Sequence, residues 1–289
     1  MSKEKIQLIA PSHHIYPKHI TNAIFSSKKL GYDLKYSPSI HQRTLSFAGS
    51  PERRANEIHQ AFKDPAVILI LAACGGNGCI EILPHLDYKL IKKNPKPIIG
   101  FSDISILLNT INQRCGHIMI HGPSQKHSWK HLSKDEQKSI INCIHKKSFK
   151  QTFEKKDILF PSTKIIKGKT SGGCLSLLVD SLATPYEIKT KNSILFLEDV
   201  DIKGRRLYTL LVQLKLAGKF QKVKAIVLGN FKNCLHAKPY LTNFFKNLTL
   251  PTVHTSLFGH GKLNHAFPIG AQAEINFDKK EIRYHFKAR

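Results

Sequence analysis

The chain has 289 residues, and 41% of them are hydrophobic, which is enough for one large domain or two ordinary ones. The formal net charge is +25, but the basic residues are spread along the chain without an aromatic-interleaved RNA-binding signature, so a specific nucleic-acid partner is not expected. No apolar run reaches the ~18 residues of a membrane span, no signal-peptide pattern opens the chain, and the cysteines form no Cys-x-x-Cys pair, so we expect a cytoplasmic protein with free thiols.

Short apolar runs alternate with helical patterns through the first half of the chain. Strands are predicted at 6–10, 32–36, 66–71 and 97–101, and helices at 19–30, 51–62, 79–92 and 104–112. The run at 66–71 is continuously apolar, as expected for a strand that is buried on both faces. Strands separated by helices imply right-handed crossovers, and therefore a parallel sheet.

A polar segment separates this half from a second block of strand signals. Residues 125–169 are rich in Lys, Ser and His and predict a helix and a connection. Further strands are predicted at 193–197, 223–228, 252–256, 273–277 and 282–286, with a helix at 205–216. We therefore divide the chain into an N-terminal domain at 1–150, a linker at 151–168 and a C-terminal domain at 169–289.

Ser102 occupies the junction between a predicted buried strand and a predicted helix, in the stretch Gly100-Phe101-Ser102-Asp103. Serine is a preferred N-cap, so this residue could simply begin the helix. The same position would also expose a nucleophile on a tight turn, beside the free N–H groups of the helix N-terminus. The nucleophile pattern Gly-x-Ser-x-Gly is incomplete, because Ile104 stands where the second glycine would be. Both interpretations stay open on these residues alone.

Three other segments carry residue types that suit catalysis. Cys74–Gly78 follows the most apolar strand, and its glycines could bring backbone N–H groups close to a ligand oxygen. Glu198, Asp199 and Asp201 crowd the end of a later strand, where they could orient a histidine or hold a divalent metal. His260 lies between two glycines, and its pKa suits a general base near neutral pH. Each segment could equally be an ordinary turn or loop.

Taken together and in order, these segments resemble one known family over nearly the whole chain. The motifs that carry the resemblance are Gly75–Gly78, Leu83–Tyr88, Asn94–Asp103, His121–Pro123, Ser171–Leu178, Leu195–Val200, Gln213–Gly218, Gly259-His260 and Pro268–Gly270. The chain resembles the LD-carboxypeptidase family of serine peptidases, which includes murein tetrapeptide carboxypeptidases and microcin C immunity peptidases. The resemblance implies an N-terminal α/β domain with a parallel sheet and a C-terminal β-rich α+β domain.

The resemblance also implies a mechanism. Matched by motif, the catalytic Ser-Glu-His triad is Ser102, Glu198 and His260, and the backbone N–H groups of Gly76 and Asp103 form the oxyanion hole. The triad would lie between the two domains and would need no metal or cofactor. The implied activity is hydrolysis of the L,D amide bond of murein tetrapeptide, which releases terminal D-Ala during cell-wall recycling. The implied partners are a small peptide substrate and a second copy of the chain in a homodimer.

Several positions depart from the family pattern. Cys74 and Asn77 replace the Arg and the aromatic residue around the glycine pair, and Cys174 replaces an Asn. In the Arg205–Thr209 stretch only Arg206 keeps its family identity. These departures leave two alternatives to a murein peptidase: an immunity-type peptidase that cleaves a peptidyl-nucleotide, and a catalytically silent binding homologue. A pocket for a D-Ala carboxylate should hold a cation near His260, whereas a nucleotide pocket should offer an aromatic surface.

Overall fold

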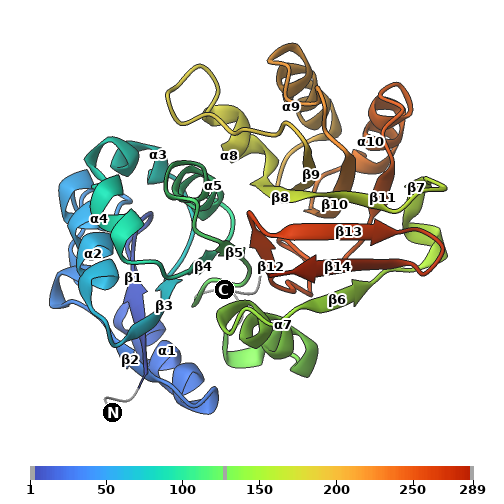
Figure 1. The fold of residues 1–289 in the computed structure, drawn as a ribbon. Helices are drawn as coiled ribbons and strands as arrows, with labels where there is room; N and C mark the ends of the chain where they lie inside the picture. Colours follow the sequence, from blue (N-terminus) through green and yellow to red (C-terminus); the bar gives the residue numbers. More distant parts are fainter. Residues whose placement is uncertain (1–3, 126–128, 287–289) are drawn as a thin grey trace.

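The computed structural model describes residues 4–125 and 129–286 of the chain. Residues 1–3, which open the chain ahead of its first strand, and residues 126–128 of the predicted connection lie outside this part. Within the described residues the strands form two sheets that lie side by side, and helices flank both of them (Figure 1). This is the α/β fold with a β-rich second half that the sequence predicts.

The first sheet has the strand order β12-β5-β4-β3-β1-β2. Its strands are β1 (Lys5–Ile9), β2 (Asp33–Lys35), β3 (Val67–Ala72), β4 (Ile98–Gly100), β5 (Met119–His121) and β12 (Phe267–Ile269). β1 to β5 pair in parallel, as predicted, and β12 pairs antiparallel with β5. The carboxyl ends of β3, β4 and β5 therefore reach one edge of the sheet, where α/β proteins build their ligand sites.

Helices connect the strands of the first sheet. They are α1 (Pro17–Lys29), η1 (Pro38–His41), α2 (Pro51–Lys63), α3 (Cys79–Ile82), η2 (Leu83–His85), α4 (Tyr88–Lys93) and α5 (Ile104–Cys115). The single helix predicted at 79–92 was wrong, because the segment divides into α3, η2 and α4. Pro84, inside η2, cannot donate a helical hydrogen bond. Asp87 then caps a new helix, since its carboxylate accepts the amides of Lys89 and Leu90 at 3.0 and 2.9 Å.

The second sheet has the strand order β6-β14-β13-β8-β9-β10-β11-β7. Its strands are β6 (Phe149–Thr152), β7 (Ile158–Phe160), β8 (Ile166–Cys174), β9 (Ser193–Val200), β10 (Ala225–Lys232), β11 (Thr252–His254), β13 (Gln272–Asn276) and β14 (Glu281–His285). The helices of this half are η3 (Trp129–His131), α7 (Lys134–Ile144), η4 (Lys155–Asp157), α8 (Leu175–Asp180), α9 (Gly204–Leu216) and α10 (Ala237–Lys246). β6, η4 and β7 occupy much of the segment predicted as a linker, so the chain already belongs to the second sheet there.

Two features join the halves of the molecule. β12 comes late in the chain yet completes the first sheet, and Figure 1 shows it between the two sheets beside β5. The end of β8 also contacts α5, where the Asn109 amide group donates to the Gly172 carbonyl at 2.8 Å and accepts the Gly172 N–H at 3.2 Å. Ser105 Oγ accepts the Cys174 N–H at 3.1 Å. The helix that follows Ser102 is thereby fixed to β8, which pairs with β9, the strand that carries Glu198.

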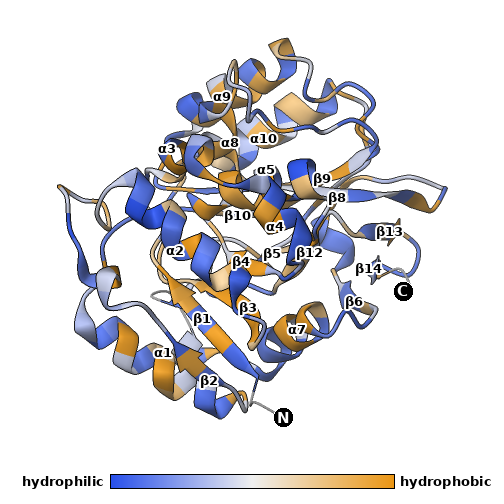
Figure 2. Cartoon of the chain, turned by 60° about the vertical axis from the view of Figure 1, so that its left-hand side comes forward, coloured by the Kyte–Doolittle hydropathy of each residue, from blue (hydrophilic) through white to orange (hydrophobic). Residues whose placement is uncertain are grey.

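The hydrophobic residues gather where sheets and helices meet. Figure 2 shows the strands β1, β3 and β4 as mostly hydrophobic, with hydrophilic stretches on the surrounding helices. In α2, for example, Ala55, Ile58 and Phe62 are buried against the sheet, and Ser50 caps the helix by accepting the Arg53 amide at 3.3 Å. Across the described residues, no helix combines the length and apolarity that crossing a membrane would require.

Candidate active site

Ser102 lies on the turn between β4 and α5 in a conformation that serine rarely adopts. Its φ is +61°, in the left-handed region that favours glycine. The N-cap of α5 is Asp103, so Ser102 precedes the capping position and the simple N-cap interpretation is wrong. A left-handed non-glycine residue stores strain of about 1–3 kcal/mol, and such residues cluster at functional sites. The turn thus has the geometry of a strand-to-helix nucleophile elbow.

The glycine loop after β3 lies directly against this turn. A Cβ added to Gly75 would lie 2.7 Å from Ser102 Cβ, 3.0 Å from Ser102 Oγ and 3.4 Å from the Asp103 amide nitrogen. Gly76 has φ +130°, and a Cβ there would overlap the His13 ring at 2.4 Å. Only a glycine at 75 lets the loop lie this close to the serine, and only a glycine at 76 leaves room for the His13 ring. The glycine loop that holds Gly76 thus lies beside the Asp103 amide, and these are the two segments that the family resemblance implies as oxyanion donors.

Buried polar side chains hold the glycine loop in place. The Asp103 carboxylate is 1% exposed and accepts Ser12 Oγ at 2.7 Å and the Cys79 amide at 2.9 Å. The fully buried Arg54 donates to the carbonyls of Gly78 at 2.9 Å and Pro11 at 3.1 Å. Charge-assisted hydrogen bonds thus fix the glycine loop to the start of α5 and to the segment around Pro11 and Ser12.

Glu198 and His260 form a close, buried pair on the other side of the site. Glu198, on β9, is 0% exposed, and its Oε2 lies 2.6 Å from His260 Nδ1 and 3.2 Å from the His260 amide nitrogen. Burial raises the pKa of Glu198, but the imidazoles of His121 and His260 outweigh this effect and hold the pKa at about 2. Burial lowers the pKa of His260, but the Glu198 carboxylate raises it above its ordinary value. Because Nδ1 faces the carboxylate, Nε2 is the nitrogen left for proton transfer.

The loop that carries His260 depends on a glycine and on distant anchors. Gly259 has φ +96°, and a Cβ there would lie 2.7 Å from Glu198 Oε2. Asn264 Oδ1 accepts the Gly259 amide at 3.0 Å, and the Asn264 amide donates to Glu136 on α7 at 2.9 Å. The position of His260 is therefore set by contacts from β9 and α7, which lie far away in the sequence.

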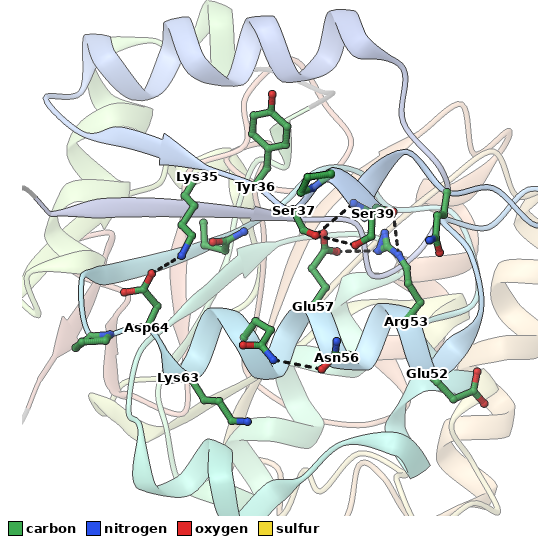
Figure 3. A pocket seen from close by; sticks show the side chains of 15 residues that line it. Lys35, Tyr36, Ser37, Ser39, Glu52, Arg53, Asn56, Glu57, Lys63 and Asp64 are labelled. Carbon is green, nitrogen blue, oxygen red and sulfur yellow. Dashed lines mark hydrogen bonds and ion pairs between the residues drawn. The ribbon is translucent and has the colours of Figure 1, made fainter.

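Ser102 and His260 line one cavity of about 380 Å³ between the two halves. The described residues that line it are His13, Cys74, Gly75, Gly76, Phe101, Ser102, Val200, Asp201, Lys232, Gly259, His260, Gly261 and Asn264. A larger pocket of about 940 Å³ lies between α2 and the segment from β2 to η1 (Figure 3). Figure 3 shows that Lys35 is paired with Asp64 in this pocket and Arg53 with Glu57, and no histidine is among its described lining residues. The smaller cavity is the candidate active site.

The three carboxylates at the end of β9 separate instead of converging. Asp199 is 1% exposed and accepts the Ser176 amide and the Val200 amide, both at 2.8 Å. Burial and the neighbouring Glu198 charge raise the pKa of Asp199 to about 6. Asp201 is exposed and accepts the Asn233 side-chain amide at 2.8 Å. Each carboxylate has its own partners, so the three do not form a shared oxygen cage for a metal.

The departures from the family pattern also have identifiable surroundings. Cys74 lines the cavity, the Asn77 side chain hydrogen-bonds the His13 ring, and the Cys174 thiol lies 3.6 Å from the Asp199 carboxylate. His13, Asn264 and Lys232 were missed from the sequence. Nothing in the local pattern of His13 or Asn264 distinguishes them from other polar loop residues. Lys232 ends an apolar strand next to the one that carries Glu198, which is the signal that could have found it.

Comparison with known proteins agrees with this geometry. Residues 6–122 match the LD-carboxypeptidase N-terminal domain, and residues 167–275 match the LD-carboxypeptidase C-terminal domain. The chain belongs to the LD-carboxypeptidase family. A probable murein peptide carboxypeptidase of Bacillus subtilis is 31% identical to this chain, and the match covers 96% of this chain and 90% of the Bacillus protein.

Two further relatives show the range of the family. A microcin C7 self-immunity protein of Escherichia coli is 28% identical over 81% of the chain and 78% of its own length. The crystal structure of a muramoyltetrapeptide carboxypeptidase from Oxalobacter formigenes superposes with a TM-score of 0.86, at 25% identity, covering 99% of this chain and 100% of the other. Membership therefore makes the chain a carboxypeptidase-type hydrolase, with a substrate that differs among relatives.

Proposed function

We propose that the chain is a serine LD-carboxypeptidase that cleaves the L,D amide bond of murein tetrapeptide and releases its terminal D-Ala. Its catalytic residues are Ser102, Glu198 and His260. The observation that carries the proposal is the cavity between the two halves, because Ser102 and His260 both line it while Glu198 lies behind His260. This is the arrangement of nucleophile, base and orienting carboxylate that acyl transfer requires.

The reaction proceeds in two steps. Ser102 Oγ forms a bond to the scissile carbonyl carbon while His260 Nε2 takes the hydroxyl proton, and His260 then gives that proton to the departing D-Ala nitrogen as the amide bond breaks. Water hydrolyses the resulting ester with His260 again as the base, which restores Ser102. Glu198 stays ionised throughout, since its pKa is held at about 2, and stabilises the imidazolium.

The negative oxygen that develops in each step needs fixed donors. The amides of Gly76 and Asp103 are the proposed oxyanion hole, and they border Ser102 from the glycine loop and from the start of α5. The α5 helix adds the positive end of its dipole at the same place. The buried contacts of Arg54 and the Asp103 carboxylate keep both amides in position before substrate binds.

Charge and ring positions favour a carboxylate-ended substrate over a nucleotide conjugate. Lys232 lines the cavity and is the only lysine or arginine among its described lining residues, so it is available to bind the D-Ala carboxylate. Trp129, the only tryptophan in the sequence, is 3% exposed and donates to the Pro123 carbonyl at 2.7 Å. Its ring packs in the core, and Phe101, which does line the cavity, is only 2% exposed, so neither ring offers a broad stacking surface there.

The test uses L-Ala-γ-D-Glu-meso-diaminopimelate-D-Ala and its D-alaninamide analogue, with the products identified by mass spectrometry. We expect the wild-type protein to release D-Ala and the Ser102→Ala variant to release none above background. We expect Lys232→Gln to raise KM for the tetrapeptide about ten-fold, the size of one hydrogen bond to a charged group, and to leave KM for the amide analogue unchanged.

Other outcomes would redirect the proposal. Cleavage of a peptidyl-nucleotide but not of the tetrapeptide would identify an immunity-type peptidase. No reaction with either substrate, and no labelling of Ser102 by a fluorophosphonate, would favour a silent binding homologue. Equal release of D-Ala by wild type and Ser102→Ala would remove Ser102 from the mechanism. The cytoplasmic location, the role in cell-wall recycling and the homodimer expected from the family resemblance belong to the same proposal.

A further inference from the structure

His121 is a buried histidine to which the proposed mechanism gives no contact with the substrate or with Ser102. It ends β5, is 0% exposed, and stacks on Phe267 with ring centroids 4.7 Å apart. The rings of Phe258 and Phe101 close two other sides, with centroids 6.0 and 6.3 Å away. Neither ring nitrogen has a hydrogen-bond partner among the described residues. A buried imidazole without partners is costly, so a specific reason for its presence is required.

Glu198 has a buried acceptor atom that likewise lacks a hydrogen-bond partner among the described residues. Its Oε2 accepts both hydrogen bonds from His260, whereas its Oε1 is buried without a hydrogen-bond partner in the described part of the chain. His121 Nε2 lies 3.7 Å from this Oε1. The gap is slightly longer than a hydrogen bond and too short for a bridging water, which needs two hydrogen bonds of about 2.8 Å. A small rotation of either side chain would satisfy both buried atoms together.

We infer that His121 is a positioning residue whose Nε2–H donates to Glu198 Oε1, so that two imidazoles hold the carboxylate from opposite oxygens. The inference rests on the proposed triad for its catalytic meaning. With Oε1 held by His121, Oε2 faces His260 Nδ1 and keeps the His260 ring aimed at Ser102. The donor must be Nε2–H, because a bare Nε2 would direct its lone pair at the carboxylate.

The remaining charged groups around the pair make its effect on pH dependence predictable. Besides Glu198, the carboxylates of Asp199 and Asp201 act on His260, and the neutral Cys174 thiol lies near Glu198. A donor on Oε1 draws negative charge away from His260. Removing that donor leaves more of the carboxylate's negative charge on Oε2, which faces His260. The pKa of His260 should then rise, and the acid limb of activity should move to higher pH.

The first test is NMR of the whole protein carrying 15N-labelled histidine, which needs neither a variant nor turnover. We expect His121 to be protonated at Nε2 and bare at Nδ1 at pH 7. In His121→Phe the pKa of His260 should rise by about half a unit, and in His121→Gln, whose Nε2 can replace the donor, it should return toward the wild-type value. His117→Phe is the matched control, because it removes a hydrogen bond to the Ile91 carbonyl elsewhere in the same segment.

Activity supplies the second readout. We expect His121→Phe to lower kcat about 10²-fold with little change in KM, to slow fluorophosphonate labelling of Ser102, and to move the acid limb upward, with His121→Gln between it and wild type. A proton on Nδ1 of His121, or an unchanged His260 pKa in both variants, would overturn the inference even if Ser102 proves catalytic. If Ser102 proves inert, the NMR result still decides whether His121 holds Glu198.

Discussion

The turn that carries Ser102 and the loop that carries His260 reach the same cavity by different routes. The backbone turn of Ser102 follows from its neighbours in the sequence, since β4 ends at Gly100 and α5 begins at Ile104, and the glycine loop then packs against it. His260 is set by residues that are distant in the sequence, namely Glu198 and, through Asn264, Glu136. The nucleophile turn can therefore form with the β4–α5 connection, whereas the base half forms only when β9, α7 and the His260 loop pack together.

This contrast separates two kinds of damage. A change at the Ser102 turn removes chemistry but leaves the docking of the halves intact. A change around His260 can remove chemistry either by altering charge or by displacing the loop. Substitutions at Glu198, Gly259 and Asp199 distinguish these causes, from the largest expected effect on activity to one expected chiefly on stability.

The largest effect is expected from Glu198→Gln. The amide has no charge to stabilise the imidazolium, and its N–H can force His260 into the wrong tautomer, so kcat should fall about 10³–10⁴-fold. Glu198 is also the main group that raises the pKa of His260, so the acid limb of the residual activity should move to lower pH. The measurement is the pH profile of D-Ala release, with fluorophosphonate labelling of Ser102 as a second readout.

A suitable control is Glu187→Gln, which removes a carboxylate paired with Lys219 at 2.7 Å outside the cavity and should leave the profile unchanged. Full activity in Glu198→Gln would show that His260 works without its carboxylate. The two halves of the site would then be independent, contrary to the comparison above.

Gly259→Ala tests whether the backbone of the His260 loop must stay close to Glu198. The new Cβ would lie 2.7 Å from Glu198 Oε2 at a φ of +96°, so the loop must move and kcat should fall about 10²-fold. Gly218→Ala is the matched control: its φ is +72°, but a Cβ there meets only the Gln221 side chain at 3.4 Å. Both variants should lose about 1 kcal/mol of stability, and only Gly259→Ala should lose activity. Equal activity in the two would mean that the loop adapts without loss.

The same contrast explains how much the sequence could predict. The strands and helices around Ser102 follow local signals, such as the apolar run of β3 and the Ser50-Pro51 start of α2, and they were predicted well. The break between α3 and α4 was missed because Pro84 and Asp87 act within an otherwise helical apolar pattern. At the site, the resemblance supplied Ser102, Glu198 and His260, which the structure brings to one cavity or directly behind it.

Contacts between distant segments could not be predicted in the same way. Nothing local marks Asn264 as the anchor of the His260 loop, because its partner Glu136 is 128 residues away. β12 is three residues long and pairs with β5 across the chain, so its role in completing the first sheet has no periodic signal. His121 belongs to the His121–Pro123 motif of the family, yet its position beside Glu198 depends on how β5 meets β9. Tertiary docking, not propensity, decides each of these cases.

The smallest effect is expected at Asp199, on the side of β9 away from His260. Its pKa of about 6 lies above the ordinary carboxyl value, so the folded state binds its proton more tightly than the unfolded state does. The free energy of unfolding should therefore fall, through this group, as pH rises from about 4 through 6, by about 2–3 kcal/mol. Asp199→Asn cannot titrate and should remove this part of the pH dependence, whatever constant cost its altered hydrogen bonds bring.

Urea denaturation between pH 4 and 8 measures the difference between Asp199→Asn and wild type, with Asp201→Asn as the exposed control. We expect the stability of Asp199→Asn relative to wild type to improve steadily between pH 4 and 7 and then to level off. The control leaves Asp199 in place, so the part of the pH dependence that belongs to Asp199 should persist in it. A flat difference at Asp199 would mean that the Val200 and Ser176 amides, which lower its pKa, outweigh burial and the Glu198 charge. In that case the Asp199 carboxylate would be ionised below pH 6 as well, and its charge would act on His260 together with that of Glu198 over the whole pH range of the activity profile.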